Sequence, residues 1–184
     1  ARLDVSDPTA VEVVQTVTLP GRARGLAVAG RHAYVGTYST AGAADSGVQV
    51  VDLRDGSAPM TPGAFVPLSG DASGMVVAGR WLYVYASGLH VLDLAAPERP
   101  VLRGSAAVDL IVWSPSGMQA VGDRVYVPTD YSNRDLLVFD VADPDTPRFL
   151  GAVPAPGDTM AVAADEAGAL LAQHGGGLVA VRFG

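Results

Sequence analysis

The chain has 184 residues, of which 49% are hydrophobic and 17% are charged, and its formal net charge is −7. Because the phosphate backbone of nucleic acid repels an acidic surface that has no basic stripe, this balance excludes DNA and RNA as partners. The absence of cysteine excludes disulfide bonds and thiolate metal sites. No apolar run reaches the ~20 residues that a membrane-spanning helix needs, so we expect no membrane span.

One pattern occurs four times along the chain: an apolar strand, a glycine turn, a strand with a tyrosine, a loop, an apolar strand that ends in Asp, and a proline-rich corner. Short runs of alternating apolar residues predict strands, and no stretch has a convincing helical period. Glycine suits the first turn because a positive φ costs it no steric strain. The first half of the pattern covers residues 25–35, 74–84 and 117–127, with a degenerate fourth copy at 159–171.

In chain order, the N-terminus supplies the third and fourth strands of a partial unit, at residues 3–6 and 11–18. The unit with the clearest pattern has strands at 75–78, 81–85, 89–94 and 101–105. The C-terminus supplies a first, second and third strand at 160–163, 170–173 and 178–183. We predict a single domain, residues 1–184, with repeats at approximately 1–18 (partial), 19–66, 67–107, 108–153 and 154–184 (partial).

The period of the pattern indicates the architecture. The residues that close successive third strands are separated by 48, 41 and 47 positions, and they are Asp4, Asp52, Asp93 and Asp140. A period of ~40–50 residues with four strands per unit is typical of propeller blades, because one unit cannot bury its apolar face alone and must stack on its neighbours. We therefore predict an all-β fold, a β-propeller of about four four-stranded antiparallel blades.

The strand count bears on whether the ring closes. Both chain ends supply a third strand, and in a four-bladed ring these two strands would compete for one position. The number of third strands therefore favours four blades that belong to a larger propeller, either within a longer protein or in a dimeric ring. A self-closed four-bladed disc is the alternative.

Two strings carry a family resemblance. The strand ending followed by Asp-Pro occurs at residues 2–8 and 137–144, together with the string Gly-x-x-Val-x-Gly-x-x-x-Tyr-Val. They resemble the LVIVD-repeat proteins over nearly the whole chain. The resemblance implies a β-propeller, often in secreted or surface-associated bacterial proteins, hence an extracytoplasmic location, and it implies no catalytic activity. The fourth copy departs from the pattern, since Leu170 replaces the tyrosine and Arg182 replaces the Asp.

The recurring polar residues are interpreted as structural. An Asp at the end of a strand accepts hydrogen bonds from the backbone N–H groups that follow it, and so organises the turn. The tyrosine in the middle of the second strand fits packing between blades, with its hydroxyl reaching a turn. The three clear copies of this aromatic are Tyr34, Tyr83 and Tyr126.

Loops that differ between copies mark a candidate binding face. The connections before the first strand and after the second strand of each blade meet on one rim of a propeller, where ligands bind. Trp113 lies in an apolar string, in a loop that is short and polar elsewhere, and it either caps the central channel or anchors a partner. A solvated set of loops is the alternative. The predicted face comprises Arg22, Arg24, Tyr38, Asp71, Trp113, Asp130, Tyr131, Asp158 and His174.

Two functions fit these predictions. The first is a non-enzymatic scaffold or interaction module that presents this face to another protein or to further copies of itself. The second is a hydrolase or lyase that uses His174 with Asp130 or Asp158 at the channel mouth, with Ca²⁺ as a candidate ion. We expect the first, and we assign no catalytic residue, metal site or cofactor. The string 174–177 resembles a lipase oxyanion motif, but no Gly-x-Ser-x-Gly accompanies it, so it predicts a hairpin turn.

Overall fold

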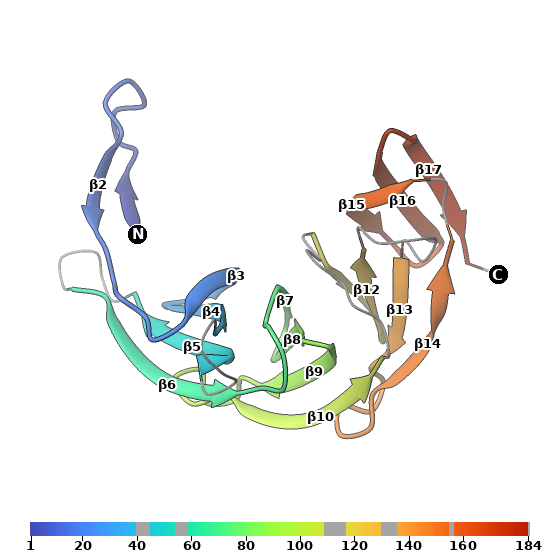
Figure 1. The fold of residues 1–184 in the computed structure, drawn as a ribbon, viewed down its shortest axis with the longest axis horizontal. Coiled ribbons are helices and arrows are strands. Elements are labelled where there is room, and N and C mark those ends of the chain that lie inside the picture. The colour runs from blue at the N-terminus through green and yellow to red at the C-terminus, as the bar shows by residue number, and fades with distance from the viewer. Residues whose placement is uncertain (40–44, 54–58, 109–116, 130–135, 155–156, 184) are drawn as a thin grey trace.

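The computed structural model describes residues 1–184 except 40–44, 54–58, 109–116, 130–135, 155–156 and 184. The elements labelled in Figure 1 are all β-strands, and neighbouring strands within each sheet are antiparallel. The N-terminal hairpin consists of β1 (Arg2–Asp4) and β2 (Glu12–Gln15). Blade 1 consists of β3 (Arg22–Ala29), β4 (His32–Tyr38), β5 (Gly47–Asp52) and β6 (Thr61–Pro67).

Two further four-stranded blades and a three-stranded sheet follow. Blade 2 consists of β7 (Gly74–Ala78), β8 (Trp81–Tyr85), β9 (Gly88–Asp93) and β10 (Val101–Ala107). Blade 3 consists of β11 (Gln119–Val121), β12 (Arg124–Pro128), β13 (Leu136–Asp140) and β14 (Arg148–Val153). The last sheet consists of β15 (Asp158–Ala164), β16 (Gly168–His174) and β17 (Gly177–Arg182).

The strands within each blade succeed one another as a meander, because tight turns join them. Gly30, Gly79 and Gly122 close the first hairpin of the three blades with φ of 56°, 58° and 53°, a conformation that side chains with a Cβ rarely adopt. The string after His174 forms the turn between β16 and β17, with a φ of 78° at Gly175. Both turns confirm the predictions made from the sequence.

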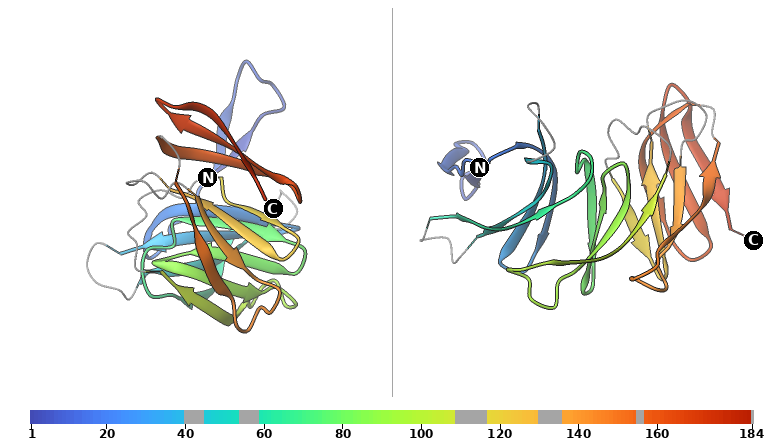
Figure 2. Two further views of the ribbon diagram at one scale, coloured as in Figure 1. Left: turned by 90° about the vertical axis from the view of Figure 1, so that its right-hand side faces the viewer. Right: turned by 60° about the horizontal axis from the view of Figure 1, so that its bottom comes forward.

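The blades follow one another along an open arc (Figure 1). The fourth strands β6, β10 and β14 lie on the outer side of the arc, and the first strands lie toward its inside. The hairpin stands at one end and the last sheet at the other, and the right-hand view of Figure 2 shows the same separation. The predicted all-β propeller architecture is confirmed, and within one described chain the arc does not close into a disc.

Three apolar clusters lie between consecutive blades. Tyr34 and Val48 of blade 1 pack with Leu82 and Leu92 of blade 2, and all four side chains are fully buried. Equivalent clusters join blade 2 to blade 3 and blade 3 to the last sheet. Blades 2 and 3 therefore each bury one face against the preceding unit and the other against the following unit, which is the packing that a single unit cannot achieve alone.

Three of the recurring Asp residues and Tyr34 make the contacts that the sequence predicts. Asp93 accepts a hydrogen bond from the backbone N–H of Ala95 at 2.8 Å, and Asp4 and Asp140 make the same contact two residues downstream. The hydroxyl of Tyr34 donates to the carbonyl of Pro97 at 3.1 Å, across the interface between blades 1 and 2. These contacts fix the corners that follow Asp4, Asp93 and Asp140.

The N-terminal strands are shorter than predicted. Residues 3–6 and 11–18 were expected to be strands, whereas the structure has β1 at Arg2–Asp4 and β2 at Glu12–Gln15. Among the described residues, β1 and β2 form a two-stranded sheet of their own whose residues are mostly exposed, and an isolated hairpin of this kind is only marginally stable. In the last sheet, β15 begins two residues earlier than predicted, at Asp158, because a bulge extends the ladder past Met160.

Candidate functional site at the rim of the arc

A β-bulge directs one arginine toward the rim of blade 1. Ala23 pairs with Thr37 and Gly25 pairs with Gly36, so Arg24 is the extra residue of strand β3. A bulge of this kind changes the direction of the side chain and is common beside functional sites. The guanidinium carbon of Arg24 lies 5.6 Å from the ring centre of Tyr38, the last residue of β4.

The connection between blades 1 and 2 completes this group. Nη1 of Arg24 lies 3.9 Å from Oδ2 of Asp71, which is exposed. The N–H of Ala72 donates to the carbonyl of Thr37 at 3.4 Å, so the connection rests directly on β4. A Cβ at Gly36 would clash with the carbonyl of Ala72, which explains why this position is glycine.

Arg24, Tyr38 and Asp71 therefore form one surface group, which we call the blade 1 rim group. Arg22 stands beside it, because it is the cross-strand partner of Tyr38. The sequence placed these four residues on one face, and the structure brings them together at the junction of blades 1 and 2.

Asp158 and His174 occupy the matching positions of the last sheet. They are cross-strand partners at the start of β15 and the end of β16, and both are exposed. The next pair inward is buried: Nε2 of Gln173 donates to Oγ1 of Thr159 at 3.2 Å. Since these two residues stand at the opposite end of the arc from the blade 1 rim group (Figure 1), the structure has two separate groups. The remaining predicted residues, Trp113, Asp130 and Tyr131, lie outside the described residues.

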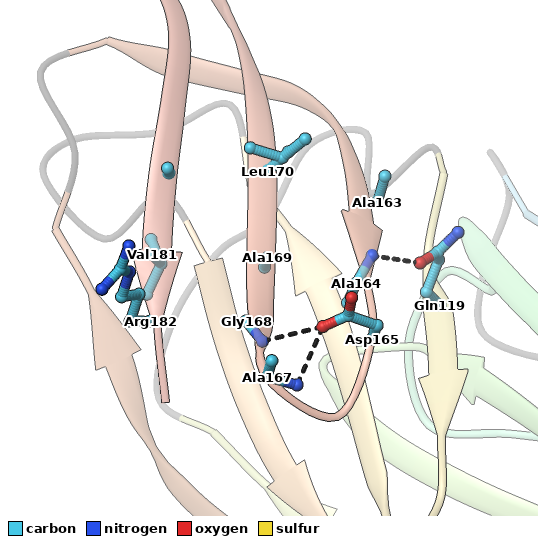
Figure 3. Close-up of a pocket in the computed structure, with 11 residues that line it drawn as sticks. Gln119, Ala163, Ala164, Asp165, Ala167, Gly168, Ala169, Leu170, Val181 and Arg182 are labelled. Atoms are coloured by element: carbon cyan, nitrogen blue, oxygen red, sulfur yellow. Dashed lines mark hydrogen bonds between the residues drawn. The ribbon is translucent and has the colours of Figure 1, made fainter. Parts of the chain in front are cut away.

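Two cavities lie away from these groups. The first, of about 660 Å³, is on the last sheet at the turn between β15 and β16 (Figure 3). In this view Oδ1 of Asp165 accepts from the N–H groups of Ala167 and Gly168, and Gln119 of blade 3 accepts from the N–H of Ala164. The second, of about 620 Å³, lies between blade 3 and the last sheet. Neither cavity includes His174, and the described residues contain no group of three His, Asp or Glu arranged to hold a metal ion.

A charged chain links blades 2 and 3, and sequence reasoning missed it. Nε of Arg80 donates to Oδ1 of Asp93 at 2.6 Å, and Nε of Arg103 donates to Oδ1 of Asp145 in blade 3 at 2.7 Å. The hydrogen bond from Arg80 lowers the pKa of Asp93 to about 2. The recurring Gly-Arg turn could have predicted the contact between Arg80 and Asp93. In blade 1, Arg31 follows Gly30 and contacts Asp52, the Asp at the end of the third strand, at 3.4 Å.

One buried histidine lies outside both rim groups. Nε2 of His90, in β9, is 3.1 Å from the carbonyl of Ala86, and Nδ1 has no partner among the described residues. Burial lowers the pKa of His90, which favours the neutral ring. Its environment fits a structural role in the face that blade 2 turns toward blade 1.

No helix of the described residues has the length and apolarity that crossing a bilayer requires. The family described as LVIVD repeat matches the chain at residues 20–64 and 69–108. No curated protein matches.

Two designed proteins have similar structures. The computationally designed Ika4 protein has a TM-score of 0.60 and 11% sequence identity, over 91% of this chain and 96% of Ika4. The computationally designed Ika8 protein has a TM-score of 0.61 and 10% identity, over 90% of this chain and 48% of Ika8, so the chain spans about half the length of Ika8. At these identities the similarity concerns the fold alone.

Proposed function

Because this chain is a LVIVD-repeat protein, we propose that it is a non-enzymatic β-propeller scaffold whose rim binds a protein partner. The observation that supports this function is the blade 1 rim group. An arginine over a tyrosine ring, on two paired strands, presents the two side chains that protein interfaces favour. The bulge in β3 and the connection that packs on β4 position Arg24 and Tyr38 before a partner binds. This positioning reduces the conformational entropy lost on association.

The charges of this group indicate the chemistry of the partner. Arg24 is paired with Asp71 at 3.9 Å, a distance at which an exposed pair contributes little stability. Arg22 is exposed beside it, on a chain of net charge −7. A partner that presents a carboxylate to these two guanidiniums would make bidentate hydrogen bonds there.

The test begins with capture of proteins from the cells that produce this chain, followed by identification and purification of the captured partner. Titration calorimetry then compares wild type with Arg24→Ala and Tyr38→Ala. We expect each substitution to weaken binding by about tenfold or more, as for interface anchors. Arg31→Ala is the matched control, because Arg31 is an exposed arginine at the opposite end of the same strand pair. Equal losses in all three variants would contradict the rim assignment.

A second candidate function is supported by the pairing of Asp158 with His174. A carboxylate beside an imidazole is the arrangement that a general base in a hydrolase or lyase needs, and Asp158 is also a candidate ligand for Ca²⁺. Activity against a panel of ester, phosphoester and uronide substrates tests it, with and without added Ca²⁺. Turnover that His174→Ala abolishes and Gln173→Ala retains would favour this function over the scaffold.

An extracytoplasmic location follows from the family resemblance and is part of the same proposal. Fractionation of the producing cells with an antibody against the chain tests it directly. Recovery in the cytoplasmic fraction alone would contradict it.

A further inference from the structure

The last sheet exposes a face that every other blade buries. Leu178 occupies the position of Val48, Leu89 and Leu136, four residues before the end of the third strand. Those three side chains are fully buried against the following blade, whereas Leu178 is 68% exposed. Leu170 shows the same contrast, because it replaces the buried interface tyrosines and is 46% exposed.

Blade 1 exposes the complementary face. Leu26 occupies the position of Met118 in blade 3 and Val162 in the last sheet, which are buried against the preceding blade. Leu26 is 65% exposed, and Val28, two residues later on β3, is 55% exposed. Of the 14 large hydrophobic residues that are exposed in the described chain, ten lie in the hairpin region, β3 or the last sheet. The exposed apolar surface is therefore concentrated at the two ends of the arc.

The N-terminal segment already occupies part of a blade ahead of blade 1. Val17 and Leu19 pack on Ala33 and Val51 of blade 1. The corresponding residues at the end of a fourth strand, such as Leu68, pack on the next blade in the same way. The segment that contains β2 thus corresponds to the fourth strand of a preceding blade, and in the described part of the chain only the three-residue β1 pairs with it.

The last sheet has the strands that this preceding blade lacks. Its three strands correspond to the first, second and third strands of a blade, and β17 has a free edge in the described chain. The cavity in Figure 3 lies on this sheet, lined by Ala163, Leu170 and Ala180, where the other blades receive side chains of the following blade. In the described chain, the last sheet therefore leaves uncovered the positions that the other blades bury against a following blade.

The cross-strand charges support the same pairing. In the hairpin, Asp4 is opposite Glu12, a like-charge pair that opposes β1–β2 pairing. If β17 replaced β1 beside β2 in the register that blades 1 to 3 share, Arg182 would stand opposite Glu12. Arg182 is the residue that departs from the Asp found in every other copy. The positive charge of Arg182 would be paired with the negative charge of Glu12 there. The equivalent pair of blade 3 also has opposite charges, since Arg148 contacts Asp140 at 3.4 Å.

We propose that two copies of this chain bind head to tail, with the last sheet of one copy and β2 of the other forming a single four-stranded blade. The new interface buries the Leu178 face against the Leu26 face of the second copy, in continuity with the three interfaces inside each chain. The same contact occurs twice, so two arcs close one ring. This inference concerns the ends of the arc and does not depend on the rim function.

The first experiment measures the mass of the full chain by sedimentation equilibrium. We expect twice the 18.8 kDa of one chain. Leu178→Arg and Leu26→Asp should each weaken association by more than about tenfold, because a charge would be buried in an apolar contact. Both residues are exposed in the single chain, so far-UV circular dichroism should be unchanged. Leu102→Arg, at an exposed leucine on β10 away from both ends, is the matched control and should associate as wild type does.

The second experiment reverses the charges of the proposed pair. Glu12→Arg alone and Arg182→Glu alone should each weaken association by roughly fivefold per contact, and the double variant should restore it. A chain that is monomeric at about 100 μM, a mass that rises beyond two copies, or a double variant no better than the singles would each overturn the proposal.

A third experiment uses the absence of native cysteine. Val13 and Val181 are opposite one another in the proposed register, so Val13→Cys and Val181→Cys chains should form a mixed disulfide when combined and oxidised. Disulfides between Val13→Cys chains alone, without the mixed product, would overturn head-to-tail pairing.

Discussion

Truncation of equivalent leucines in two blades should have very different costs. Leu89 and Leu178 occupy the same position of the repeat, but Leu89 is fully buried and Leu178 is 68% exposed. Leu89→Ala loses the whole transfer free energy of the removed methyl and methylene groups and leaves a cavity between blades 2 and 3. We expect it to lower the free energy of unfolding by about 3 kcal/mol. Leu178→Ala removes a side chain that is only about a third buried, so its cost should be under about 1 kcal/mol.

The assay is equilibrium unfolding in guanidinium chloride, followed by tryptophan fluorescence at several chain concentrations. The loss in Leu89→Ala should be the same at every concentration, because the contact lies within one chain. The loss in Leu178→Ala should grow as concentration rises, because the wild type then gains stability by association that the variant lacks.

Equal losses for the two variants at low concentration would refute the reasoning. They would mean that Leu178 is buried within the single chain and that the last sheet is covered by another part of it. A loss below about 1 kcal/mol for Leu89→Ala would equally contradict the packing between blades 2 and 3.

Three further predictions concern polar groups. Burial lowers the pKa of His90, so the free energy of unfolding should fall as pH drops below the ordinary histidine pKa of 6.5. The difference in unfolding free energy between pH 7.5 and pH 5 should be smaller in His90→Leu than in wild type. The pKa of Asp93 is about 2 because Arg80 donates a hydrogen bond to it, so the ionised carboxylate stabilises the folded state above pH 3.8 and this stabilisation is lost as pH falls toward 2. In an acid titration, Asp93→Asn should not show this fall in the free energy of unfolding. Tyr34→Phe removes the hydrogen bond to Pro97 and should cost about 1 kcal/mol in thermal unfolding; an unchanged stability would show that the bond has no net value.

The charged contacts and the rim group show what the repeat could and could not predict. The Gly-Arg turn and the strand-end Asp are both visible in the sequence, but their contact depends on the pairing of β8 with β9, which brings Arg80 beside Asp93. The rim residues were predicted as a set from loop positions. Their division into two groups could not be, because it depends on how far apart blade 1 and the last sheet stand along the arc.

The sequence by itself determined the blade. Alternation of apolar residues, glycine at the turns and the recurring Asp and Tyr are local features, and they specify strands, hairpins and the faces that must be covered. The tertiary structure decided which of those faces remain open. Leu178 and Leu89 have the same local sequence role, and only the presence or absence of a following blade distinguishes a buried core residue from an exposed one. Burial is a property of neighbours in space, so the same repeat position in two copies cannot by itself specify which of the two side chains is buried.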